Sequence, residues 1–148
     1  MSKIKKVKGR QVFDSRGNPT VEAEVFSENG NSASAIVPSG ASTGTHEAFE
    51  LRDKDNKEYL GKSVLKAVEN INVQINKALE KTNINEQKKI DQTLINLDGS
   101  EQKKILGANA ILAVSIASCK LASTENKVSL YEHIGPVSYT HLTLPTIS

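Results

Sequence analysis

The chain has 148 residues, of which 37% are hydrophobic and 24% are charged, and its formal net charge is +2 at pH 7. This length suits one domain with a modest core, and the composition excludes an intrinsically disordered chain. A net charge this small does not indicate a nucleic-acid-binding protein, and no apolar run is long enough to predict a membrane span. The single cysteine, Cys119, cannot form an internal disulfide, so the sequence predicts a cytoplasmic protein in a reducing compartment.

The first third of the chain shows the pattern of three short β-strands. The runs that predict them are residues 4–13, 20–27 and 32–37. The second run has apolar residues at every other position: Val21, Ala23 and Val25. Such alternation is typical of a strand with one buried face. Short connections rich in turn formers, such as the pair Asn29-Gly30, predict that the three strands form an antiparallel meander.

The second half of the chain has the period of helices. A first apolar stripe, which predicts one amphipathic helix, steps by three or four residues through Val64, Val68, Ile71, Ile75 and Leu79. A shorter helix carries Ile90, Leu94 and Leu97. We expect a capping box of Asn83 and Glu86 before this second helix, and its end near Asp98-Gly99.

The run of residues 108–121 mixes small residues with large apolar ones on nearly every face of a helix. Small residues let neighbouring elements approach closely, so this run predicts a central, buried helix. Strands followed by helices indicate an α+β fold, in which three to four helices pack on one face of the three-stranded sheet.

The most distinctive segment, residues 37–47, follows the third predicted strand and reads Val-Pro-Ser-Gly-Ala-Ser-Thr-Gly-Thr-His-Glu. Its glycines give the chain conformational freedom, and its hydroxyl and carbonyl oxygens suit a hard cation or a phosphate. A nucleotide-binding P-loop is not indicated, because no lysine follows Gly44. As a bare pattern, a loop rich in serine and glycine is more often an ordinary connection.

Together with the earlier run Asp-Ser-Arg-Gly-Asn-Pro-Thr-Val-Glu at residues 14–22, this segment resembles the N-terminal domain of enolases. The resemblance covers about residues 3–134. It implies that the parent protein interconverts 2-phosphoglycerate and phosphoenolpyruvate by dehydration in glycolysis and gluconeogenesis. It also implies two Mg²⁺ ions per active site and a homodimer or higher homo-oligomer.

The resemblance assigns roles to particular residues. It implies a substrate lid that contains Ser39, Gly40, Ala41, Ser42, Thr43, Gly44 and His46. Ser42 matches the serine that binds the second Mg²⁺. Arg10, Arg16 and Glu22 are implied at the dimer interface, where residues matching Arg10 and Glu22 form ion pairs with the partner's barrel.

The same residues have plainer interpretations. A lone histidine such as His46 is more often a structural hydrogen-bonding residue than a catalytic one. Without a partner, Arg10 and Glu22 are expected to be exposed and to contribute little to stability. A mixed charge run is usually a solvated surface, although its arginine could pair with an acid beside the lid; the run consists of Glu47, Glu50, Arg52, Asp53 and Asp55.

We assign residues 1–135 to one enolase N-terminal domain. Residues 136–148 match neither the family nor any regular period, and we expect an artefactual or disordered tail. The resemblance places the base lysine, the acid glutamate and the carboxylates of the first metal in a barrel domain that this chain lacks, so we expect the chain alone to be inactive. Two other classes stay open: a stand-alone anion-binding module, and a non-catalytic scaffold or surface-adhesion fragment.

Overall fold

The computed structural model describes residues 2–38 and 48–134. Its strands are β1 (Ile4–Phe13), β2 (Pro19–Ser27) and β3 (Ser32–Val37). They form one antiparallel sheet in the order β1-β2-β3, which confirms the predicted meander. The strand limits also agree with the prediction, except that β2 begins one residue earlier, at Pro19.

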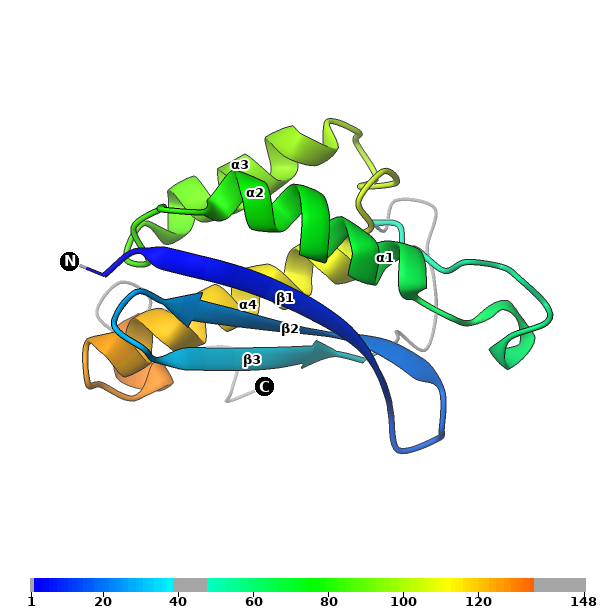
Figure 1. The fold of residues 1–148 in the computed structure, drawn as a ribbon, viewed down its shortest axis with the longest axis horizontal. Coiled ribbons are helices and arrows are strands. Elements are labelled where there is room, and N and C mark those ends of the chain that lie inside the picture. The colour runs from blue at the N-terminus through cyan, green and yellow to red at the C-terminus, as the bar shows by residue number, and fades with distance from the viewer. Residues whose placement is uncertain (1, 39–47, 135–148) are drawn as a thin grey trace, which may run out of the picture.

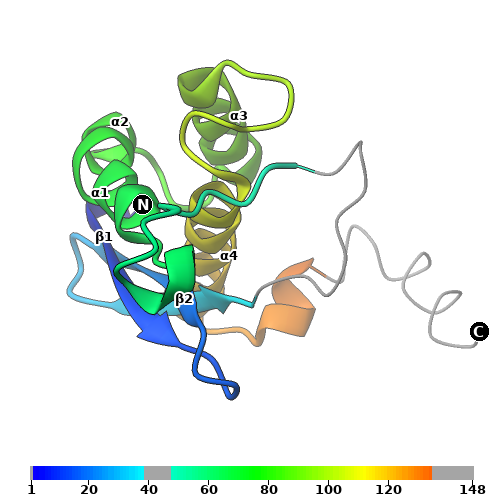
Figure 2. The same ribbon diagram turned by 90° about the vertical axis from the view of Figure 1, so that its right-hand side faces the viewer.

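The helices follow the sheet along the chain. They are η1 (Tyr59–Gly61), α1 (Leu65–Asn70), η2 (Ile71–Ile75), α2 (Asn76–Leu79), α3 (Gln87–Asp98) and α4 (Ala108–Glu125). The long helices lie on one side of the sheet, which confirms the α+β arrangement (Figures 1 and 2). α4 packs directly on β2 and β3, and α3 packs on α4, so α4 is the predicted central helix.

The core lies between the sheet and the helices. The inward face of the sheet presents Val7, Val21, Ala23, Val25 and Ala35, none of them more than 3% exposed. The apolar stripe that predicted the first long helix is buried too, apart from Val68, which is partly exposed. On α4 the small residues Ala110, Ala113 and Ala117 are fully buried, which lets this helix lie close to the strands.

The first predicted helix is continuous but not uniform. The π-helical turn η2 separates α1 from α2, and both residues that flank it keep helical backbone angles. Apolar spacing alone did not predict this change of hydrogen-bond pattern, because the buried stripe runs through it unbroken. Among the described residues, no helix combines the length and the apolar character needed to cross a lipid bilayer.

The predicted capping box of Asn83 and Glu86 is wrong. α3 begins at Gln87, and no side chain caps its first turn. The side-chain oxygen of Asn83 instead accepts a hydrogen bond from the N–H of Asn85 at 2.9 Å, which closes a tight turn. The other end of α3 agrees with the prediction, because Gly99 follows Asp98 with a left-handed φ of 73°.

Side chains of the long helix cover the outer edge of β1. The side-chain oxygen of Asn76 accepts from the N–H of Val7 at 2.8 Å. The carboxamide of Asn72 accepts from the N–H of Gly9 at 2.8 Å and donates to its C=O at 3.2 Å. A Cβ at Gly9 would lie 2.9 Å from the Cβ of Ile71, so this close approach requires glycine. The edge is thereby closed to further strand pairing at these positions.

Candidate functional site

The loop of residues 39–47, which contains all seven predicted lid residues, lies outside the residues that the structure describes. The segments on either side of it are described, and they define the candidate site. The chain reaches the loop through Val37 at the end of β3. It leaves the loop through residues 49–53, which we call the anchor segment.

The end of β3 is fixed to β2. Val37 pairs with Val21 in the antiparallel ladder. In addition, the hydroxyl of Thr20 donates a hydrogen bond to the C=O of Val37, and Thr20 is only 2% exposed. A buried hydroxyl bond added to strand pairing leaves the backbone at Val37 little freedom.

The anchor segment is fixed to the start of α4. The N–H of Phe49 donates to the C=O of Gln102 at 2.6 Å, and the C=O of Phe49 accepts from the N–H of Ala108 at 2.7 Å. Two residues further on, the carboxamide of Asn109 accepts from the N–H of Leu51 and donates to its C=O, both at 3.1 Å. Both backbone groups of Phe49 and of Leu51 are therefore paired.

Charged side chains of the same segment reach other elements. The guanidinium of Arg52 forms an ion pair with Glu50 and donates to the C=O of Pro19 at 3.0 Å. The carboxylate of Asp53 accepts from the N–H groups of Leu65 and Lys66, each at 3.0 Å, and so caps α1. The anchor segment thereby connects the beginnings of β2, α1 and α4.

These contacts correct one expectation and confirm another. The interpretation of residues 47–55 as a solvated charge run is wrong for Glu50, Arg52 and Asp53, which are half-buried, whereas Asp55 is exposed as expected. The reason is that distant backbone groups of the fold bind these side chains. The suggested pairing of Arg52 with an acid beside the lid is confirmed by its contact with Glu50.

A buried carboxylate supports the loop that receives the anchor segment. Asp98 is 2% exposed and accepts from the N–H of Leu106 at 2.7 Å and from the N–H of Ser100 at 2.9 Å. Burial alone acts to raise the pKa of Asp98. The hydrogen bonds from Ser100 and Leu106 outweigh burial, so the pKa lies below its ordinary value. The charged carboxylate of Asp98 thus holds the turn that leads into α4.

The three residues implied at a dimer interface lie on and beside the open face of the sheet. Arg10 contacts Glu22 at 2.6 Å and Glu24 at 2.8 Å. The expectation that Arg10 and Glu22 are exposed is wrong, because their side chains are only 35% and 17% accessible in this paired arrangement. Hydrogen bonding to Glu22 and Glu24 raises the pKa of Arg10, and Arg10 lowers the pKa of Glu24. Arg16 is exposed in the turn closed by Asp14. The interface itself stays a prediction.

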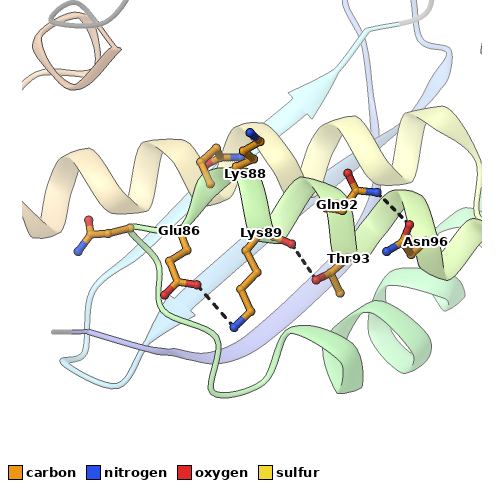
Figure 3. A pocket seen from close by; sticks show the side chains of 8 residues that line it. Glu86, Lys88, Lys89, Gln92, Thr93 and Asn96 are labelled. Atoms are coloured by element: carbon orange, nitrogen blue, oxygen red, sulfur yellow. Dashed lines mark hydrogen bonds and ion pairs between the residues drawn. The ribbon is translucent and has the colours of Figure 1, made fainter.

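The described surface also includes two hollows. An open groove of about 750 Å³ runs along α3, and Figure 3 shows its lining of amide, threonine and lysine side chains. Lys89 pairs there with Glu86 at 3.6 Å. A second, mainly apolar cavity of about 330 Å³ touches Ala48 and Lys103. The ammonium of Lys103 donates to the C=O groups of Ser100 and Glu101, so it is already engaged. Of the predicted site residues, the structure describes Arg10, Arg16 and Glu22, and these three line neither hollow.

The metal prediction concerns Ser42 and so lies outside the described residues. Within residues 2–38 and 48–134, no three His, Cys, Asp or Glu side chains gather as a metal-binding group. Residues 37–47 offer mainly hydroxyl and carbonyl oxygens, from Ser39, Ser42 and Thr43 among others. Oxygen donors of this kind suit Mg²⁺, which often completes its octahedron with water and substrate oxygens.

Sequence reasoning missed three residues that hold the candidate site together: Asp98, Gly107 and Asn109. For Gly107 and Asn109, the available signal was a glycine followed two residues later by the one polar residue of the run 108–114. A polar side chain in the buried first turn of such a helix needs a partner. That partner, Leu51, lies 58 residues away along the chain, and no sequence pattern around Leu51 indicates the contact.

The chain is similar to one protein family and to a curated protein of that family. The family described as "Enolase, N-terminal domain" matches residues 4–134. The curated protein "Enolase" of Pelagibacter ubique (strain HTCC1062) is 64% identical to the chain over 132 residues. These residues make up 89% of this chain and 31% of that relative, so the chain spans about a third of the relative's length.

Proposed function

Because the chain belongs to the family of enolase N-terminal domains, we propose that it is the lid-bearing part of an enolase. The whole enzyme, a phosphopyruvate hydratase and therefore a lyase, interconverts 2-phosphoglycerate and phosphoenolpyruvate. The observation that carries this proposal is the 64% identity to an enolase over 132 residues, which make up 89% of this chain. The firm attachment of both ends of the loop 39–47 supports it further.

The reaction sets the requirements that each part of the enzyme must meet. The proton beside the substrate carboxylate is very weakly acidic, so its removal needs a base and concentrated positive charge. Loss of hydroxide then needs a general acid. We place the base and the acid in the part of the longer protein that this chain does not include. Mg²⁺, when bound, supplies positive charge to the substrate oxygens.

The contribution of this chain is to bind and to position. Ser42 is proposed as an oxygen ligand of the second Mg²⁺, with its neighbours in residues 39–47 lying over the substrate. The end of β3 and the anchor segment hold the two ends of that loop. A ligand carried on such a loop allows metal binding and water exclusion to occur together.

We also propose that the enzyme is a cytoplasmic homodimer or higher homo-oligomer. The open sheet face carries Arg10 with Glu22, and Arg16 lies in the adjacent turn. In a dimer these groups would meet charges of the partner. Arg10 already bonds two carboxylates within its own chain, so any ion pair with a partner adds to or replaces those contacts.

The 148-residue chain alone is expected to have no enolase activity, because it lacks the proposed base, acid and first-metal site. With saturating Mg²⁺ and 2-phosphoglycerate, the formation of phosphoenolpyruvate, followed by ultraviolet absorbance, should equal that of buffer. The chain must be freed of host enolase, which a mock purification from cells without the gene controls. Steady turnover above the level of the mock purification would contradict the proposal that the base, the acid and the first-metal site lie outside this chain.

Replacing Ser42 with alanine tests the proposed ligand in an active enzyme. We suggest a chimera in which residues 4–134 replace the matching part of the Pelagibacter ubique enolase. The unsubstituted chimera should be active, and an inactive folded chimera would count against the proposed function. Ser42→Ala should lower kcat about tenfold or more, which equals a loss of about 1.4 kcal/mol, and leave the first Mg²⁺ affinity unchanged. Ser34→Ala, at an exposed serine of β3 outside the lid, is the control and should keep wild-type kcat. Wild-type kcat in Ser42→Ala would exclude the ligand role.

A further inference from the structure

The anchor segment is bonded at every second residue, as an extended chain would be in a sheet. Phe49 pairs with the backbone of residues 102 and 108, and the N–H of Asp53 donates to the C=O of Ser63 at 2.9 Å. Between these two residues, the N–H and C=O of Leu51 form no hydrogen bond with the backbone of another described segment. The side chain of Asn109 takes that place, accepting at 3.1 Å and donating at 3.1 Å.

The chemistry of this contact is specific for asparagine. Its carboxamide offers one acceptor and one donor on a short stem, which matches the N–H and C=O of a single residue. An aspartate in its place would keep the acceptor and lose the donor, and an alanine would lose both. Asn109 is 5% exposed, so water does not readily replace either bond.

The neighbouring backbone leaves no room for the contact to shift. Gly107 has a φ of 94°, and a Cβ there would lie 2.6 Å from the Cβ of Leu51 and 2.6 Å from the Oδ1 of Asn109. Leu51 itself packs against the hydrophobic core. Position and direction of the chain at Leu51 are therefore set by the start of α4 and by Asn109.

We propose that Asn109 is a positioning residue for the catalytic site of the enzyme, acting through the backbone of Leu51. This inference rests on the proposed function. Asn109 touches neither substrate nor metal in this account. Together with the two backbone bonds of Phe49, it fixes the segment that follows residues 39–47, which we propose to lie over the substrate. Misplacement of groups by about 1 Å costs enzymes up to about a hundredfold in rate.

A second asparagine in the same fold provides a matched control. Asn72 makes the same two bonds to one distant residue, accepting from the N–H of Gly9 and donating to its C=O. Its partner lies on the outer edge of β1 and not in the anchor segment. Asn72→Ala thus removes the same two kinds of bond, at an exposed position, without releasing the anchor segment.

The experiment compares Asn109→Ala and Asn72→Ala in the chimeric enzyme described above. We expect Asn109→Ala to lower kcat about tenfold or more and to raise the Mg²⁺ concentration needed for activity, with KM for 2-phosphoglycerate changed less. Asn72→Ala should change each constant less than about twofold, although both substitutions lower Tm. Rates are measured well below both melting temperatures, so that loss of folded protein does not contribute.

The outcomes separate the two proposals. Equal kinetic effects of the two substitutions, or wild-type kinetics in Asn109→Ala, would overturn the positioning role while the proposed function stands. An inactive unsubstituted chimera would overturn the proposed function and this inference with it. If Asn109→Ala does not fold, Asn109→Asp carries the same test, because it keeps the bond to the N–H of Leu51 and loses the bond to its C=O. A kcat equal to wild type in Asn109→Asp would then overturn the role.

Discussion

Replacing Gly107 with alanine is expected to lower the free energy of unfolding by about 2–6 kcal/mol, through two separate effects. The φ of 94° and ψ of 132° at this position are unfavourable for any residue with a Cβ, at a cost of about 1–3 kcal/mol. The new methyl group would also lie 2.6 Å from the Cβ of Leu51, and overpacking of this kind costs about 1–3 kcal/mol.

Gly30→Ala separates the two effects. Gly30 has nearly the same φ, 90°, but no atom lies within 4 Å of the added Cβ. Urea unfolding of both variants should therefore show the backbone cost alone in Gly30→Ala and a larger loss in Gly107→Ala. Equal losses in the two variants would mean that the close contact between Gly107 and Leu51 does not exist in solution.

Asp98→Asn is the second substitution with a large expected effect. The amide keeps one acceptor, so one of the N–H groups of Ser100 and Leu106 loses its partner and faces another donor. A buried donor left unpaired costs about 1–3 kcal/mol, and we expect a loss in this range at about pH 7. Asp55→Asn, at an exposed position, should change stability by less than about 0.5 kcal/mol.

The loss should depend on pH in a defined direction. The pKa of Asp98 is lower in the folded chain than in the unfolded chain, so the unfolded chain binds the proton more readily. The stability that Asp98 contributes is complete above the unfolded value of about 3.9 and is lost as pH falls through the folded value. The difference in unfolding free energy between wild type and Asp98→Asn should shrink below about pH 4. A difference that stays constant down to about pH 2.5 would contradict a lowered pKa.

The parts of the fold that follow from local pattern were predicted from the sequence. Alternation in β2, the apolar stripe of the long helix and the small residues of α4 each report burial on one face, and the structure buries those faces. The glycine after Asp98 ends α3 because a left-handed residue terminates a helix at low cost. Each of these signals depends only on residues that are close together in the sequence, so each can be recognised from the sequence of one protein.

The parts that depend on distant partners were not predicted. Asn83 and Glu86 have the spacing of a capping box, but Asn83 closes a turn with Asn85, and a local hydrogen bond of that kind competes with capping. Arg10 was expected to be exposed because the dimer partner is absent, but Glu22 lies opposite it on the adjacent strand, 12 residues away along the chain. Likewise, nothing near Asn109 in the sequence indicates that its carboxamide would meet Leu51, and residues 39–47 lie outside the described structure.

The covered edge of β1 has a consequence for synthesis on the ribosome. The three strands are complete once residue 37 has been made, but Asn72 and Asn76 and the backbone of residues 81–84, which together occupy that edge, come later. At about 5–20 residues per second, the interval from residue 37 to residue 84 is about 2–10 s. During this interval the emerging sheet presents an unpaired row of N–H and C=O groups. Nascent chains on neighbouring ribosomes of one message can pair through that row, so slower translation between residues 38 and 84 should increase aggregation of newly made protein without changing the stability of the finished fold.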